Sequence, residues 1–297
     1  MRYLFTTEQL ITLFQSSGLE CSPASPFRTL CALNSVMEDA EDDLTAEEKL
    51  LAKVALCPEK TLVCGRHSTA EGPLYLLRSG AIWYVYLWME KQDRHAFYAY
   101  YDTPALAGML RKNFCGFYHP DFGAFSPLNL RLDKNEAITW NLIRAYFASR
   151  ARVSGFASNE PFSADDLKDP DLALYLRNPL DEVGFSDWSD AVDELMDESR
   201  HEGMDAALRG LQSKQVLAYD VNPMDHNEVV YSLTRTAIER LDDGLLIDTV
   251  FFADRTDPDA PQEILFCLRR DGVLAYCPVK DGVVLRTLSE IPWEELL

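Results

Sequence analysis

The stretch PLYLLRSGAIWYVYLWMEKQDRHAFYAYYDTPALAGMLRK, residues 73–112, decides the fold. It holds three apolar runs rich in aromatic and β-branched residues, which are separated by short turn segments at 78–80 and 90–94. Apolar runs bounded by turn residues are typical of strands, and Thr103-Pro104 is typical of the start of a helix. The stretch therefore predicts a β-meander that is followed by a helix, with strands at Leu74–Leu77, Ala81–Met89 and His95–Tyr101.

The second of these runs is apolar on both of its faces. Successive side chains of a strand point to opposite faces, so Tyr84 and Tyr86 share one face while Trp83 and Val85 share the other. A strand that is apolar on both faces is typical of the middle of a sheet. We therefore expect this strand to be central and covered by helices on at least one side.

Capping and periodicity indicate helices and further strands around the meander. A helix is expected to begin at Thr6 or Thr7 and end at Gly18, and Thr45 with Glu48 has the spacing of a capping box. Residues 134–153 have the period of a long amphipathic helix, and residues 205–212 resemble another. The last 83 residues contain six strand candidates, with Asp-Gly turns at 271–272 and 281–282: Gln215–Tyr219, Val229–Thr234, Leu245–Ala253, Ile264–Arg269, Val273–Cys277 and Val283–Thr287. The pattern predicts an α+β fold with a central, mostly antiparallel β-sheet and flanking helices.

Two segments far apart in the chain resemble each other. Leu74–Val85 can be laid over Leu265–Tyr276 with one residue inserted at the turn, and each segment lies within an order of helix, strand, meander and helix. This order predicts duplicated halves related by a pseudo-two-fold axis, 1–130 and 131–297, packed as one compact unit. Chance similarity between two hairpins is the alternative.

Composition restricts the partners. The 297 residues carry a formal charge of −20, which argues against nucleic acid, because binding to phosphates needs clustered Lys and Arg. No window approaches the length of a membrane span, so no membrane insertion is expected. The seven cysteines are odd in number and form no Cys-x-x-Cys pair, which favours reduced thiols and a cytoplasmic location.

The sequence contains no catalytic or cofactor signature. A phosphate-binding Gly-rich loop, a Gly-x-Ser-x-Gly elbow and a His-Glu-x-x-His pair are all missing, and the five histidines lie far apart. We therefore predict a protein that is not an enzyme and takes no cofactor and no metal. The alternative is a hydrolase that uses a polar group from the set Asp225, His226 and Glu228, or from His119 and Asp121.

Residues 158–205 form an acidic insertion. They include 15 acidic and 3 basic residues, a net charge of −12. Such a segment is either a solvated insertion or a docking surface for a partner. On the second interpretation, the candidate partner-binding residues are Trp188, Asp190, Asp193, Glu194 and Asp197.

In element order, the chain resembles the EspG-type chaperones of type VII (ESX) secretion. The similarity lies in the N-terminal helix and meander, the strand-rich tail with Asp-Gly hairpins, the duplicated helix–sheet unit and the acidic composition. The resemblance implies a cytosolic, non-enzymatic protein with a central sheet between two helical bundles. It also implies that the chain binds a helical secretion substrate and covers the apolar tip of that substrate.

Two functions from different classes follow. The first is a protein-binding protein, a secretion-associated chaperone or adaptor. The second is an acidic immunity protein that neutralises a basic toxin or nuclease, because acidic surfaces accelerate the capture of basic partners.

Overall fold

The computed structural model describes most of the chain and divides it into two compact units. The described residues are 2–33, 44–66, 72–116, 128–154, 160–169, 171–172, 195, 201–222, 229–241, 246–257, 262–269 and 272–297. Unit 1 comprises Met1–Tyr118, Asp248–Glu263 and Ile291–Leu297, and unit 2 comprises His119–Ile247 and Ile264–Glu290. The predicted halves, 1–130 and 131–297, concern a duplication of sequence and stay a prediction.

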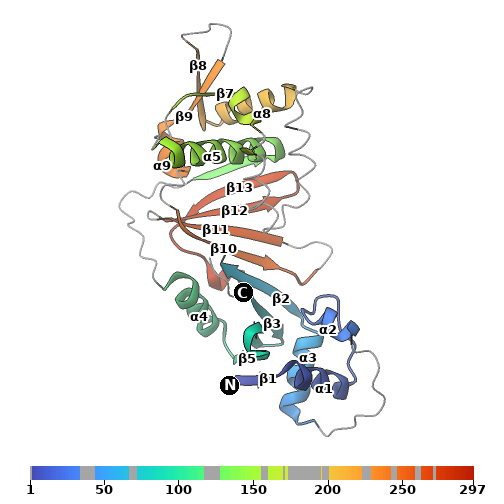
Figure 1. Cartoon of the computed structure of the whole chain (residues 1–297). Helices are drawn as coiled ribbons and strands as arrows, with labels where there is room; N and C mark the ends of the chain where they lie inside the picture. Colours follow the sequence, from blue (N-terminus) through green and yellow to red (C-terminus); the bar gives the residue numbers. More distant parts are fainter. Residues whose placement is uncertain are drawn as a thin grey trace. The chain divides into compact units, whose positions relative to one another are not determined.

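Unit 1 is an antiparallel sheet with helices on both faces (Figure 1). The strands follow the order β1-β5-β4-β3-β2-β10, and each pair of neighbours is antiparallel. Most of β10 belongs to this unit. Its elements are β1 (Arg2–Phe5), α1 (Thr7–Ser17), α2 (Arg28–Leu33), α3 (Ala46–Leu56), β2 (Lys60–Arg66), β3 (Leu74–Ser79), β4 (Ile82–Met89), β5 (Arg94–Tyr100), α4 (Thr103–Cys115), β10 (Leu246–Asp254) and α10 (Trp293–Leu296).

The predicted meander is confirmed as β3, β4 and β5. Ser79 lies opposite Ile82, so Gly80 and Ala81 form a two-residue turn, and Gly80 has a φ of 59°, which favours glycine. Strand β4 lies between β3 and β5, as its two apolar faces predict. Tyr84 and Tyr86 belong to the core under α1, α2 and α3, while α4 packs on the other side of the strands (Figure 1).

The predicted helix ends in unit 1 are also confirmed. The Thr6 hydroxyl accepts a hydrogen bond from Gln9 N (3.2 Å), and Gln9 Oε1 accepts one from Thr6 N (2.9 Å). Thr45 and Glu48 form the same reciprocal box at the start of α3, and Gly18 ends α1 in the left-handed conformation. Strand β1, which precedes Thr6, was not predicted, because its four residues carry no turn signal of their own.

Unit 2 contains two groups of antiparallel strands. One follows the order β11-β12-β13-β6 and the other the order β7-β9-β8. The predicted hairpins of the tail are confirmed, since Arg269 pairs with Gly272 and Val279 pairs with Gly282. The elements are β6 (Asn129–Asp133), α5 (Lys134–Ser154), β7 (Phe162–Ser163), η3 (Asp165–Lys168), α8 (His201–Ser213), β8 (Leu217–Val221), β9 (Val229–Leu233), α9 (Arg235–Leu241), most of β11 (Gln262–Arg269), β12 (Gly272–Val279) and β13 (Gly282–Leu288).

The structure has the predicted α+β class, with antiparallel strands and flanking helices. Across the part of the chain that is described, no helix has both the length and the apolar character needed to cross a bilayer.

Candidate protein-binding surface

The β8–β9 hairpin of unit 2 presents one continuous apolar face. Its register pairs Leu217 with Leu233, Tyr219 with Tyr231, and Val221 with Val229. Because paired residues and every second residue share a face, these six side chains all lie on the same side of the hairpin. The opposite side carries Ala218, Asp220, Val230 and Ser232.

The base of this apolar face is covered. Leu217 and Tyr231 are buried, and α8 packs against β8. The Tyr231 ring lies 6.1 Å from the ring of Phe162 on β7, which in turn contacts Tyr146 and Phe147 of α5. The base of the hairpin is therefore part of the core of unit 2.

The distal part of the same face is open to solvent. Tyr219 is 58% exposed, Val221 45% and Val229 43%, and we call these three residues the apolar strip. The β8–β9 hairpin extends beyond α5 and α8 (Figure 1), in keeping with the exposure of these side chains. Single exposed apolar residues are ordinary, but three that are adjacent on one face are typical of an interaction surface.

The outer edge of β8 is a second feature of this surface. Among the described residues, β8 has a neighbouring strand on one side only, namely β9. Thr234 N donates to Val216 O (3.0 Å), which makes 216 and 234 a hydrogen-bonded pair that continues the register of the hairpin. Hydrogen-bonded and non-hydrogen-bonded pairs alternate in an antiparallel ladder, so the backbones of Tyr219 and Val221 face away from β9.

One of these outward groups is already occupied by a local contact. Val221 N donates to the Asp220 carboxylate of the same strand at 2.8 Å. An acidic side chain folded over an exposed edge is one way in which proteins limit indiscriminate strand pairing.

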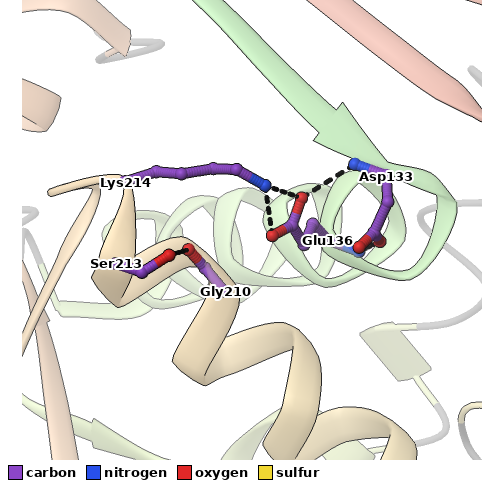
Figure 2. A network of polar contacts seen from close by, with 5 residues as sticks. All are labelled: Asp133, Glu136, Gly210, Ser213 and Lys214. Atoms are coloured by element: carbon purple, nitrogen blue, oxygen red, sulfur yellow. Dashed lines mark hydrogen bonds and ion pairs between the residues drawn. The ribbon is translucent and has the colours of Figure 1, made fainter.

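A partly buried ion pair fixes the turn that leads from α8 into β8 (Figure 2). Lys214, just after α8, bonds both carboxylate oxygens of Glu136 in the first turn of α5. Glu136 is 3% exposed, and its Oε2 also accepts a hydrogen bond from Asp133 N (2.7 Å) while Asp133 Oδ1 accepts one from Glu136 N (2.9 Å). Asp133 and Glu136 thus form a capping box whose acidic member also holds the base of the hairpin.

The same place in the fold requires a small residue on α8. A Cβ added at Gly210 would overlap the Glu136 carboxylate, so α8 approaches α5 closely at this point. Thr234 completes the anchor, because its hydroxyl donates to Gln215 O (2.7 Å) and accepts from Ala237 N (3.1 Å) at the start of α9. The base of the hairpin is therefore held by α5, α8 and α9.

The residues predicted from the acidic insertion lie outside the described residues. This holds for Trp188, Asp190, Asp193, Glu194 and Asp197, and for the polar groups of the hydrolase alternative: His119, Asp121, Asp225, His226 and Glu228. Their roles stay predictions. Within the described ranges, no group of three or more His, Cys, Asp or Glu side chains is placed to hold a metal ion.

Both strands of the hairpin were predicted from the sequence, but the apolar strip was not. The alternation of Leu217, Tyr219 and Val221 with Ala218 and Asp220 is a signal that defines the face. The alternation does not tell which part of the face the helices cover, since that depends on how far the hairpin extends beyond α5 and α8.

A buried histidine in unit 1 belongs to a second network of polar side chains. This network has a structural role. His95 Nδ1 lies 2.9 Å from Tyr86 Oη, and Nε2 lies 3.0 Å from Thr7 Oγ1, which donates to Asp93. Burial raises the pKa of Tyr86, so its hydroxyl stays protonated and donates to Nδ1 of a neutral imidazole. The group joins β4 and β5 to the first turn of α1, and His95 is too buried to meet a substrate.

The pH dependence of stability is expected to report this histidine. Burial lowers the pKa of His95 below its ordinary value, and the charge of Asp93 opposes this only in part. The folded state therefore favours the neutral ring. The contribution of this ring to the free energy of unfolding is complete above the unfolded pKa of about 6.5 and is lost as the pH falls below that value. Urea midpoints at pH 7.5 and 5.5 should differ more in the wild-type chain than in His95→Gln, and equal differences would contradict this assignment.

The chain was compared with known proteins at three levels. No protein-family model matches it, and no curated protein matches it. Among solved structures, it is similar to the Mycobacterium tuberculosis type VII secretion system chaperone EspG5, solved in complex with a PE25–PPE41 dimer. The likeness covers 100% of this chain and 93% of that one, with 10% sequence identity and a TM-score of 0.43. A likeness at this level carries no inference about function.

Proposed function

We propose that this chain is a non-enzymatic protein-binding protein, a chaperone or adaptor, and that it captures its partner on the apolar strip of the β8–β9 hairpin. The observation that carries the proposal is the apolar face itself, which is core at its base and solvent-exposed at Tyr219, Val221 and Val229. A partner that covers the strip would extend the packing that Leu217 and Tyr231 begin.

The anchoring of the hairpin supports this role. A binding element must be held in one orientation, and Lys214, Glu136 and Thr234 hold the base of the hairpin through side-chain contacts. Association with secretion is part of the proposal and is supported by the element order of the sequence, which resembles that of the EspG-type chaperones.

The charge favours a second candidate function, which belongs to a different class. A net charge of −20 attracts a basic protein and accelerates its capture, as expected of an immunity protein that neutralises a basic toxin or nuclease. Salt separates the two candidates: capture of a basic toxin should weaken steeply as ionic strength rises, whereas an apolar chaperone interface should tolerate salt.

Substitution of the strip tests the proposal. A partner is first captured by the tagged wild-type chain in its host and purified, and its affinity is then measured by calorimetry. The variant Tyr219→Ala/Val221→Thr should weaken binding by a factor of about ten or more, because aromatic and apolar anchors in the centre of an interface dominate affinity. Threonine keeps the strand propensity of valine, so the hairpin should stay folded.

The matched control is Val279→Thr. Val279 is also a strand valine, on β12, and is 38% exposed. It should leave the affinity unchanged. Equal affinities of the strip variant and the Val279 variant, both folded by circular dichroism, would refute the proposal.

A further inference from the structure

We propose that the partner contributes an extended strand that pairs with the outer edge of β8, with apolar side chains over the strip and a basic side chain opposite Asp220. This inference rests on the proposed function and names the kind of partner segment that the surface fits. It adds two requirements to that function, namely backbone pairing and a positive charge.

The backbone geometry provides for such a strand. The groups of Tyr219 and Val221 that do not bond β9 face the open edge, with the spacing of a ladder. An added strand would extend the order β7-β9-β8 by one member. Addition of a peptide strand to an open sheet edge is a common mode of recognition, in which main-chain bonds give affinity and alternate side chains give specificity.

The side chains of β8 indicate which residue types the added strand should have. Its residues opposite Tyr219 and Val221 would lie on the face of the strip, so they should be apolar. Its residue opposite Asp220 would lie on the other face, where Asp220 is exposed. Opposite charges facing each other across strands stabilise a sheet, and equal charges destabilise it, so this residue should be Lys or Arg.

Asp220 also restricts which strands can enter. Its carboxylate accepts the Val221 N–H at 2.8 Å, and a strand that pairs with Val221 must replace this bond by a ladder bond. A basic residue on the incoming strand gives the released carboxylate a new partner, whereas an acidic residue gives it none. Entry is thus favourable for a basic strand and unfavourable for an acidic one.

The net charge favours a different protein over a second copy of this chain as the partner at the β8 edge. Two copies that met edge to edge through β8 would bring together two molecules of net charge −20, each with its own Asp220 at the contact. Repulsion between them opposes self-pairing and leaves a basic partner strand as the occupant.

Synthetic peptides test the inference on the intact chain. The probe is a fluorescent seven-residue peptide, blocked at both ends, that alternates Lys with Val or Tyr. Three relatives are compared with it: one with Glu in place of Lys, one fully N-methylated, and a longer helical peptide with the same apolar residues on one face. Binding is measured by anisotropy at physiological ionic strength, where the general attraction of a cationic peptide to the net charge of −20 is screened.

We expect the Lys peptide to bind about tenfold more tightly than the Glu peptide and the N-methylated peptide. Asp220→Lys should reverse the preference between Lys and Glu, and Asp220→Asn should reduce it. The variant Tyr219→Ala/Val221→Thr should weaken binding of the Lys peptide. The proposed strand pairing would be refuted if the Lys and Glu peptides bound equally. It would also be refuted if the N-methylated peptide bound as well as its parent.

The experiments distinguish a failure of the proposed strand pairing from a failure of the proposed function. If the helical peptide binds in place of the Lys peptide, and the strip variant no longer binds it, strand pairing is refuted. The apolar strip then remains the proposed binding surface. A dimer of the wild-type chain in sedimentation that is lost in the strip variant would show that a second copy occupies the edge, and would refute the pairing with a basic partner strand too. If none of the peptides binds, and capture of the host partner does not change in the strip variant, both proposals fail.

Discussion

Replacement of Lys214 by Met is expected to lower the free energy of unfolding by about 3 kcal/mol. The substitution removes the ammonium that bonds both oxygens of Glu136, and leaves a buried carboxylate that still accepts a hydrogen bond from the Asp133 amide. Loss of one partner of a buried pair costs about 3–5 kcal/mol. The lower end applies because the Lys214 side chain is 32% exposed, so water can reach the carboxylate from that side. Urea denaturation followed by circular dichroism measures the loss.

Two further variants control this result. In Glu136→Gln/Lys214→Met the buried charge is gone together with its partner, so the double variant should lose less than the sum of the two single ones. Lys168→Met removes a lysine whose partner, Asp165, is 84% exposed, and should cost less than about 1 kcal/mol. A Lys214 variant as stable as the Lys168 variant would show that the pair does not hold the hairpin base.

Replacement of Trp293 by Ala is expected to lower the free energy of unfolding of unit 1 by about 4 kcal/mol. Trp293 is 1% exposed and stacks on Phe114 of α4 with ring centroids 5.7 Å apart. Its indole N–H has no hydrogen-bond partner among the described residues, so the substitution loses burial and packing without breaking a hydrogen bond. The cost follows from the cavity that is left under α10, and thermal or urea unfolding measures it.

Trp88 provides the matched control. It is a tryptophan of the same unit but is 50% exposed at the end of β4, where its ring stacks on His95. Trp88→Ala should cost less than about 1 kcal/mol, because surface substitutions seldom change stability much. Equal losses in the two variants would mean that α10 contributes little to the core of unit 1.

Local signals predicted much of the fold. The cap at Thr6, predicted as Thr6 or Thr7, the capping box of Thr45 and the turn at Gly80 are each formed by residues within three or four positions of each other, so the sequence alone indicates them. The central position of β4 followed from its two apolar faces. What these features share is that their physical cause lies within the segment itself.

The missed features depend on residues that are far apart in sequence. Strand β1 exists because Tyr3 pairs with Phe97, and the hairpin base is fixed because Lys214 reaches Glu136. The apolar strip is exposed because the hairpin extends beyond α5 and α8. None of these relations leaves a periodic trace in the sequence. The partner-binding role of the acidic insertion and the duplication of the two halves stay predictions.

The ion pair at the base of the β8–β9 hairpin also has a consequence for the thermodynamics of association. Because Lys214 and Glu136 fix the turn when unit 2 folds, the hairpin base has already lost its conformational entropy before a partner arrives. Such pre-organisation shifts the ordering cost from binding to folding. A partner strand therefore meets a template rather than a flexible loop, and more of the interaction free energy appears as affinity.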